Sequence, residues 1–338
     1  MVLIYSSALE RWITEPGLIL LTMFICSATD DNLPIRLLIG EMMAHCSDKN
    51  DYSTYGWIRF LGLIILGCLI IIGQGVAKQP LSDHNSTIKI AIFRMSPEVG
   101  NFTANHATIE EAIHISSENG ANWFITPEMA ESGYEFTDYS TIDQLPEFPS
   151  SWLSRLETIS REENITLFIG FPQRLGNNYY NSVAVINRNG NISGIHQKTN
   201  IMPGTHEGWA TPGNATPLEV DNLKIGYYIC ADAADQNITN RYIASEVDIM
   251  LSSAAWYPDP NMGPEPNWKN ITLTTDVPLV IANTAGKKGK LDFTHANSGV
   301  FQNGRELYQI PGTEQGIAFV DWNYLTGEIK PEGEEEVR

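Results

Sequence analysis

From Thr87 onward, short apolar runs that alternate every second residue are separated by stretches with the apolar spacing of a helix. The run Thr87–Phe93 alternates like a strand with one buried face, whereas Ala104–Asn119 places Ile109, Ala112 and Ile113 on one side of a helix. This order of strands and helices, followed by hairpin-like strands, predicts an α/β layered fold with mixed sheets.

The ends of these elements carry their own signals. Thr103 is the expected N-cap of the first helix and Gly120 its C-terminal stop. A second helix is expected at Ser150–Asn164, and Asn189-Gly190 is the expected turn of a hairpin. Further strands are expected at Leu223–Ile229, Asp248–Ser252 and Leu279–Ala282, with a helix near Ile238–Glu246.

The alternation divides the chain into three parts. Residues 78–330 form the predicted folded domain, residues 331–338 an acidic, solvated tail, and residues 1–77 an N-terminal extension of different character. In the extension, the segment 57–77 contains twelve uninterrupted apolar or glycine residues, Leu61–Ile72. That core has the length of a signal-peptide core and is short of the ~20 residues of a full span.

The apolar segment leaves two readings open, a cleaved signal peptide or a retained membrane anchor, and a buried core helix is the less specific alternative. Either of the first two places the folded domain outside the cytoplasm, as an exported (periplasmic or secreted) or membrane-anchored protein. The 56 residues that precede the segment are unusual for a signal peptide, so the true start site stays open.

Charge and metal-ligand spacing narrow the class of partner. The formal net charge of −19 opposes phosphate backbones, so nucleic acid is not an expected partner. The sequence contains no C-x-x-C pair and no H-x-x-x-H spacing, so neither a metal nor another cofactor is expected. A small molecule is the expected partner.

Three reactive side chains follow predicted strands. Glu128 comes directly after an apolar run, Lys198 ends the second arm of the hairpin, and Cys230 ends the strand before it turns. Ligands of layered α/β folds bind at such strand ends. Glu207 lies nine residues after Lys198 and can reach the same pocket. A helix entry at Ala231 and a neighbouring lysine would both lower the pKa of the thiol.

Together the three residues complement one another chemically, although each alone is compatible with an ordinary turn, surface or core position. A thiol needs a base before it attacks, a developing oxyanion needs positive charge, and a departing amine needs a proton. Glu128, Lys198 and Cys230 supply these functions without a cofactor.

These residues lie in three blocks that resemble the nitrilase superfamily of carbon–nitrogen hydrolases: WFITPEMAESGY, GIHQKTNIMPGTHEGWATPG and KIGYYICADAAD. The resemblance covers about Ile88 to Trp322 and implies a four-layer α-β-β-α sandwich. It implies that Cys230 attacks an amide carbon to give a thioester, that Glu128 is general base and acid, and that Lys198 and the Ala231 N–H stabilise the oxyanion. It also implies Glu207 as a supporting glutamate, and a homodimer or higher homo-oligomer.

Departures from the family pattern bear on the substrate. True nitrilases typically carry Cys-Trp-Glu, whereas this chain has Cys230-Ala231-Asp232, which favours amide or N-carbamoyl substrates over nitriles. By position, pocket-lining residues are expected to be Tyr134, Tyr180, Asn181 and Trp256.

Two other classes of function remain alternatives. The first is an acyltransferase that passes the acyl group from the cysteine thioester to an amine acceptor. The second is a non-catalytic binding module on the same fold. Whether the N-x-S/T sites of the chain carry glycans is also left open by the sequence.

Overall fold

The computed structural model describes residues 86–337, except 135–139, 202–206, 260–262 and 289–290. The apolar segment 57–77, and with it the predicted signal peptide or anchor, lies outside the described residues. Within the described part of the chain, no helix has both the length and the apolar character that crossing a bilayer requires.

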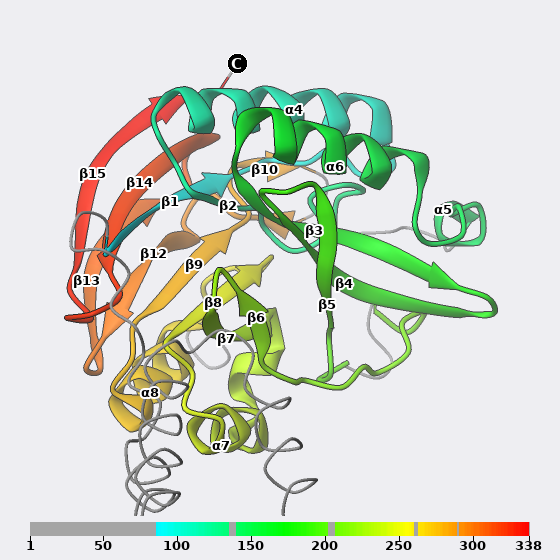
Figure 1. Ribbon diagram of the computed structural model, residues 1–338. Helices are drawn as coiled ribbons and strands as arrows, with labels where there is room; N and C mark the ends of the chain where they lie inside the picture. Colours follow the sequence, from blue (N-terminus) through cyan, green and yellow to red (C-terminus); the bar gives the residue numbers. More distant parts are fainter. Residues whose placement is uncertain (1–85, 135–139, 202–206, 260–262, 289–290, 338) are drawn as a thin grey trace, which may run out of the picture. The chain divides into compact units, whose positions relative to one another are not determined.

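Two mixed sheets dominate the described part of the chain (Figure 1). In spatial order, the seven-stranded sheet contains β15 (Ile329–Glu336), β14 (Gly316–Asn323), β1 (Thr87–Arg94), β2 (Trp123–Ile125), β3 (Thr166–Leu175), β4 (Asn178–Asn187) and β5 (Asn191–Gln197). The six-stranded sheet contains β13 (Arg305–Pro311), β12 (Asn297–Gln302), β9 (Leu279–Asn283), β8 (Ile249–Ala254), β7 (Leu223–Ile229) and β6 (Leu218–Val220). A separate pair joins β10 (Lys287–Lys288) to β11 (Leu291–Asp292).

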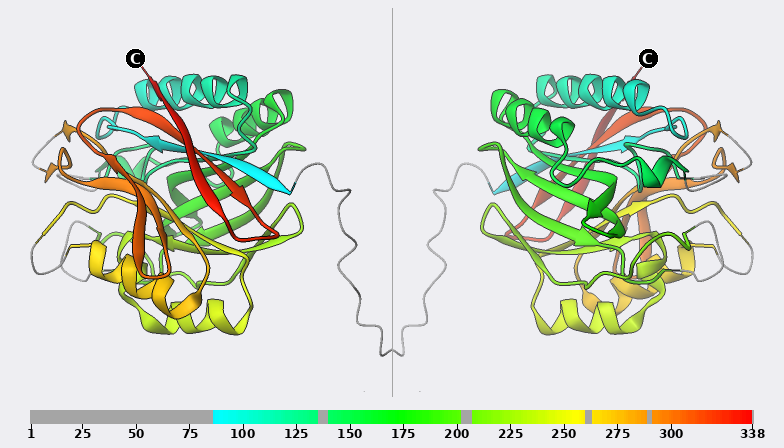
Figure 2. Two further views of the ribbon diagram at one scale, coloured as in Figure 1. Left: turned by 90° about the vertical axis from the view of Figure 1, so that its left-hand side faces the viewer. Right: turned by 90° about the vertical axis from the view of Figure 1, so that its right-hand side faces the viewer.

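Helices cover the outer face of each sheet, which completes an α-β-β-α sandwich (Figures 1 and 2). The helices are α4 (Phe102–Glu118), α5 (Ser140–Asp143), α6 (Ser151–Glu163), α7 (Gln236–Ala244) and α8 (Glu265–Thr275), with the short 3-10 helix η2 (Cys230–Ala234). One apolar cluster lies between the seven-stranded sheet and α4 and α6, and a larger one joins both sheets to α7 and α8. The predicted four-layer fold is confirmed.

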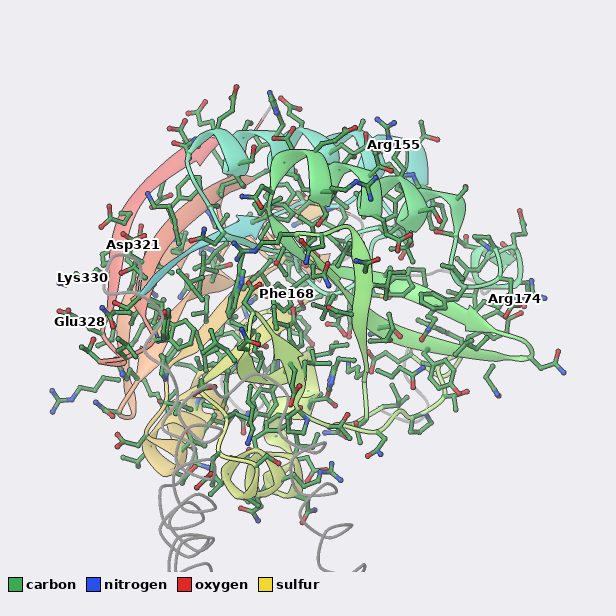
Figure 3. The ribbon with its side chains drawn as sticks, in the orientation of Figure 1. Arg155, Phe168, Arg174, Asp321, Glu328 and Lys330 are labelled. Carbon is green, nitrogen blue, oxygen red and sulfur yellow. The ribbon has the colours of Figure 1, made fainter. Side chains whose placement is uncertain are left out.

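Aromatic rings hold the two sheets together at the centre of the sandwich, where Figure 3 labels Phe168. The Phe168 ring of β3 packs on Tyr227 of β7 at 5.8 Å between centroids and on Trp123 of β2 at 5.6 Å. Aromatic pairs of this kind contribute about 0.5–1.5 kcal/mol each beyond their buried area. These contacts fix the spacing between β2, β3 and β7. Of these strands, β2 leads to Glu128 and β7 leads to Cys230.

The two long helices begin at side-chain caps. Helix α4 begins two residues before the position expected from the sequence, because the Asn101 side chain rather than Thr103 caps it by accepting a hydrogen bond from the N–H of Ala104 at 3.3 Å. Helix α6 follows the prediction, with Ser150 as N-cap and Asn164 in a left-handed conformation at its end.

The C-terminal residues differ from the solvated tail that the sequence suggests. Residues Ile329–Glu336 form β15, which pairs antiparallel with β14 along the edge of the seven-stranded sheet. Their acidic side chains stay exposed, but the backbone is hydrogen-bonded, and Glu334 forms an ion pair with Arg94 at 2.7 Å. The folded domain therefore continues through β15.

Candidate active site

The turn that carries Glu128 is fixed against the neighbouring strand β3. The backbone N–H of Gly170 donates to Thr126 Oγ1 at 2.8 Å, just before Pro127 and Glu128. A Cβ atom at position 170 would lie 2.2 Å from the Pro127 carbonyl oxygen, so only glycine lets the two segments approach this closely. The carboxyl group of Glu128 is completely buried as a result.

Lys198 follows β5 and lies between two carboxylates. Its backbone N–H donates to the Asn181 carbonyl at 2.8 Å, and its own carbonyl accepts from the N–H of Gly213 at 2.8 Å. The ammonium, only 1% exposed, donates to Glu128 Oε1 at 2.8 Å and also to Glu207 Oε1. Charge-assisted hydrogen bonds of this kind join the buried ammonium to the two carboxylates.

Cys230 follows β7 with φ of +48°, a left-handed conformation that is rare for residues other than glycine. Such a conformation costs about 1–2 kcal/mol and persists when the surrounding structure determines it. The backbone N–H of Ala255 donates to Glu128 Oε2 at 2.9 Å, and the same amide lowers the pKa of the Cys230 thiol. One amide thus acts on both the carboxylate and the thiol.

Electrostatics in this cluster favour a protonated ammonium beside a basic carboxylate. Burial by itself would lower the pKa of Lys198, but the charges of Glu128, Cys230 and Glu207 raise it further than burial lowers it. Burial raises the pKa of Glu128, and the charge of Glu207 adds to this, whereas Lys198 and Asn181 oppose it without reversing it.

The pKa of the Cys230 thiol is raised, contrary to the lowering that its sequence position suggested. Burial is the largest cause, and the negative charge of Glu128 adds to it, while Lys198 and the Ala255 amide act in the opposite direction. The raised pKa favours the protonated thiol.

Asn181 and Tyr134 lie in the same cluster. The Asn181 amide nitrogen donates to Glu128 Oε1 at 2.8 Å and to Glu207 Oε1 at 3.4 Å, so its role is to hold the carboxylates. The ring of Tyr134 lies 5.9 Å from the Lys198 ammonium, and burial and the nearby carboxylates keep the pKa of its phenol well above the usual value.

The other two expected pocket residues are Tyr180 and Trp256. Successive side chains of a strand alternate between faces, so Tyr180 lies on the face of β4 opposite Asn181. Trp256 follows Ala255, packs edge-on against Trp268 at 6.1 Å, and exchanges backbone hydrogen bonds with the Asn283 side chain at 2.9 Å.

The sequence analysis did not identify a backbone amide that binds Glu128, nor the buried polar side chains that support the turns around the site. The Ala255 amide carries no sequence signal. Ser253 Oγ, bonded to the Tyr227 hydroxyl at 2.7 Å, donates to the Thr126 carbonyl at 2.7 Å and so links the six-stranded sheet to the turn before Glu128. Asp232, two residues after Cys230, is buried and fully hydrogen-bonded, and a buried acidic residue so near a nucleophile was a usable signal.

A depression adjoins the cluster at Tyr134. It is lined by Ser96, Pro97, Val99, Tyr134, Thr284, Ala285, Leu291 and Phe293. Its walls are mainly apolar, as small-molecule sites usually are. Among the described residues, no group of three or more His, Cys, Asp or Glu side chains is placed to hold a metal ion.

Replacing Asn181 by alanine should shift the acidic limb of the pH–activity profile upward. The amide hydrogen bond lowers the pKa of Glu128, so its loss raises that pKa and leaves less of the carboxylate ionised at a given pH. Hydrogen bonds to charged groups contribute about 1.5–3 kcal/mol, so kcat/KM should fall about tenfold or more below the shifted limb. Asn178→Ala, on the exposed part of the same strand, is the matched control and should leave the profile unchanged.

The structure is thus an α-β-β-α sandwich with a buried cluster of two carboxylates, an ammonium and a thiol at the ends of its strands. Residues 89–326 match the carbon–nitrogen hydrolase family. The chain belongs to this family, and its predicted membership of the nitrilase superfamily of carbon–nitrogen hydrolases is confirmed.

The relatives are distant in sequence. A probable nitrilase of Schizosaccharomyces pombe is 23% identical over 242 residues, which cover 68% of this chain and 86% of the relative. An N-carbamoylputrescine amidase of Solanum lycopersicum is 23% identical over 236 residues, covering 64% of this chain and 77% of the relative. A citrullinase of Francisella tularensis is 29% identical over 160 residues, covering 44% and 54%.

Solved structures share the fold. A mutant of the amidase from Nesterenkonia sp. AN1, with the acetamide moiety of fluoroacetamide added covalently at its active-site cysteine, superposes with a TM-score of 0.61 at 21% identity, covering 70% of this chain and 91% of that one. The glutamine-dependent NAD+ synthetase of Acinetobacter baumannii gives a TM-score of 0.62 at 20% identity, covering 75% of this chain and 48% of that one.

Proposed function

We propose that this carbon–nitrogen hydrolase cleaves the non-peptide C–N bond of an amide or N-carbamoyl compound through a thioester on Cys230. The observation that carries the proposal is the buried position of Glu128 beside both partners: its Oε1 accepts from the Lys198 ammonium at 2.8 Å, and its Oε2 accepts from the Ala255 amide, which also lowers the pKa of the Cys230 thiol. Base, cation and nucleophile are thereby held in one buried cluster.

The first half of the reaction forms the thioester. Glu128 accepts the thiol proton as the sulfur attacks the substrate carbonyl carbon, and the carbonyl π electrons move onto oxygen. Lys198 and the Ala231 N–H stabilise that oxyanion. Glu128 then gives its proton to the nitrogen, the C–N bond breaks, and ammonia or an amine leaves. The raised pKa of Glu128 suits a group that must both take and return a proton.

The second half consumes water. Glu128 takes a proton from the attacking water, the C–S bond of the second tetrahedral intermediate breaks, and the thiol is restored with release of the carboxylic or carbamic acid. Glu207 keeps the ammonium in place through its own contact with Lys198. Burial of the whole cluster strengthens each of these interactions, because water does not screen them.

The substrate class follows from two kinds of support. Relatives include an N-carbamoylputrescine amidase and a citrullinase, and Cys230-Ala231-Asp232 departs from the Cys-Trp-Glu pattern of true nitrilases. Tyr134, whose ring lies beside the Lys198 ammonium, also lines a small, mainly apolar depression. Homo-oligomer assembly and an N-terminal signal or anchor stay predictions, which light scattering and cell fractionation would test.

An ammonia-release screen tests the proposed reaction. The full chain should release ammonia from at least one amide or N-carbamoyl compound, and intact-mass spectrometry should find an acyl adduct on Cys230 that water removes. Protein pretreated with iodoacetamide is the control and should be inactive. Turnover that survives alkylation of Cys230 would contradict the mechanism, and transfer of the trapped acyl group to an added amine faster than to water would favour the acyltransferase alternative.

A further inference from the structure

The carboxylate of Asp232 is buried and accepts four hydrogen bonds. Oδ1 accepts from the backbone N–H groups of Thr199 at 3.0 Å and Asn200 at 2.7 Å. Oδ2 accepts from the backbone N–H of Ile229 at 3.1 Å and from Nε2 of His196 at 3.3 Å. Because a buried ionised carboxylate is costly unless its oxygens are hydrogen-bonded, this donor set stabilises the acidic residue at this position.

The donors come from the two segments that carry catalytic groups. The two backbone donors to Oδ1, which include Asn200, directly follow Lys198. The backbone donor to Oδ2 belongs to the residue directly before Cys230. A second hydrogen bond also joins the two segments: the Asn200 side-chain amide donates to the Ala231 carbonyl at 2.8 Å. Asp232 and Asn200 therefore join the lysine segment to the cysteine turn at two adjacent points.

The cysteine turn needs such support because its backbone is strained. Cys230 has a φ of +48°, which is unfavourable for a residue with a Cβ atom. A left-handed non-glycine residue persists when the surrounding structure over-determines it. The Asp232 bond to the Ile229 N–H holds the turn on its N-terminal side, directly before the strained residue.

We propose that Asp232 is a positioning residue that sets the spacing between the Lys198 ammonium and the Cys230 thiol, with Asn200 as its second link and His196 orienting its carboxylate. The inference rests on the proposed function for its catalytic consequence. Its structural consequence is the distance between the lysine ammonium and the cysteine thiol, and this distance does not depend on any substrate.

Asp232→Asn is the sharpest variant because it keeps the shape and removes one acceptor oxygen. In either orientation the new NH2 group faces a backbone N–H, either that of Ile229 or those that follow Lys198. The two segments should move apart there. A displacement of about 1 Å at a reacting centre can cost about 100-fold in rate, so kcat should fall about 100-fold with a much smaller change in KM.

Thiol reactivity gives a readout that a purely structural role would leave unchanged. Lys198 lowers the pKa of Cys230, so a more distant ammonium lets that pKa rise. The pH midpoint for alkylation of Cys230 by iodoacetamide, followed by peptide mass mapping, should therefore move upward in Asp232→Asn, and alkylation at a fixed pH below it should slow.

Asn200→Ala is a milder variant that still tests the proposal if Asp232→Asn does not fold. It removes only the side-chain bond to Ala231, while its backbone N–H can still bind Asp232. Its kcat should fall about five- to tenfold with the same direction of change in alkylation. Asp235→Asn is the matched control, since that carboxylate caps α7 through the Asn237 N–H at 2.9 Å and should alter neither readout.

The outcomes separate the two proposals. If both variants keep the wild-type kcat and alkylation profile once corrected for folded fraction, Asp232 is only structural, whatever happens to the unfolding temperature. If no variant and no wild-type protein hydrolyses amides but the alkylation midpoints shift as described, the positioning inference holds and the proposed function fails.

Discussion

Cys230→Ala should leave a folded protein whose kcat/KM for its amide substrate is lower by at least about 10⁴-fold. The proposed reaction passes through a covalent bond to this sulfur, and losing a nucleophile removes the contribution of the whole catalytic unit rather than of one contact. The measurement is ammonia release under saturating and limiting substrate, together with intact-mass analysis, which should find no acyl adduct. Retained turnover in this variant would refute the thioester route.

A glycine at the same position tests whether the loss is chemical rather than structural. Because residue 230 has a φ of +48°, glycine fits its backbone without the steric cost that alanine carries. Cys230→Gly should therefore be more stable than Cys230→Ala, by about 0.5–1 kcal/mol, yet equally inactive. An inactive variant that unfolds no more easily than its alanine counterpart assigns the loss of activity to the missing sulfur.

The strand ends that carry the site could be read from the sequence because each signal is local. Glu128, Lys198 and Cys230 each end an apolar run, and the structure brings all three into one buried cluster with Glu207. The face of each strand was also readable in part. Counting alternation along β4 would have separated Tyr180 from Asn181.

What the sequence did not yield depends on contacts between distant segments. The pKa of the Cys230 thiol is raised because burial outweighs Lys198, and the depth of burial is a property of the assembled sandwich. The Ala255 amide acts through backbone, which any residue other than proline supplies. Strand β15 has almost no apolar side chain to mark it, and it is held by its backbone pairing with β14.

Lys198→Met should combine a large loss of activity with a large loss of stability. Removing a preorganised oxyanion donor costs about 10²–10³ in kcat. In addition, Glu128 and Glu207 would remain buried and face each other without the ammonium between them, and breaking a buried pair in this way costs about 3–5 kcal/mol. Kinetics and urea unfolding measure the two effects. Lys269→Met, in an exposed pair with Glu265, is the control and should leave stability almost unchanged, because exposed ion pairs contribute little.

The stability deficit of Lys198→Met should depend on pH with a defined sign. Burial and the charge of Glu207 already raise the folded-state pKa of Glu128, and without Lys198 that pKa rises further. A carboxyl whose folded pKa is raised binds a proton more tightly in the folded than in the unfolded state, where it titrates near 4.3. The deficit relative to wild type should therefore be largest at neutral pH and shrink as pH falls through the raised pKa.

The double variant Lys198→Met/Glu207→Gln separates charge from chemistry. Neutralising Glu207 removes one of the two facing carboxylates, so part of the lost unfolding free energy should return at neutral pH and the pH dependence should weaken. Activity should not return, because the oxyanion donor is still absent. If instead the single variant is as stable as wild type at pH 7, the buried pair is not the stabilising contact that the geometry indicates, and the electrostatic account of the site is wrong.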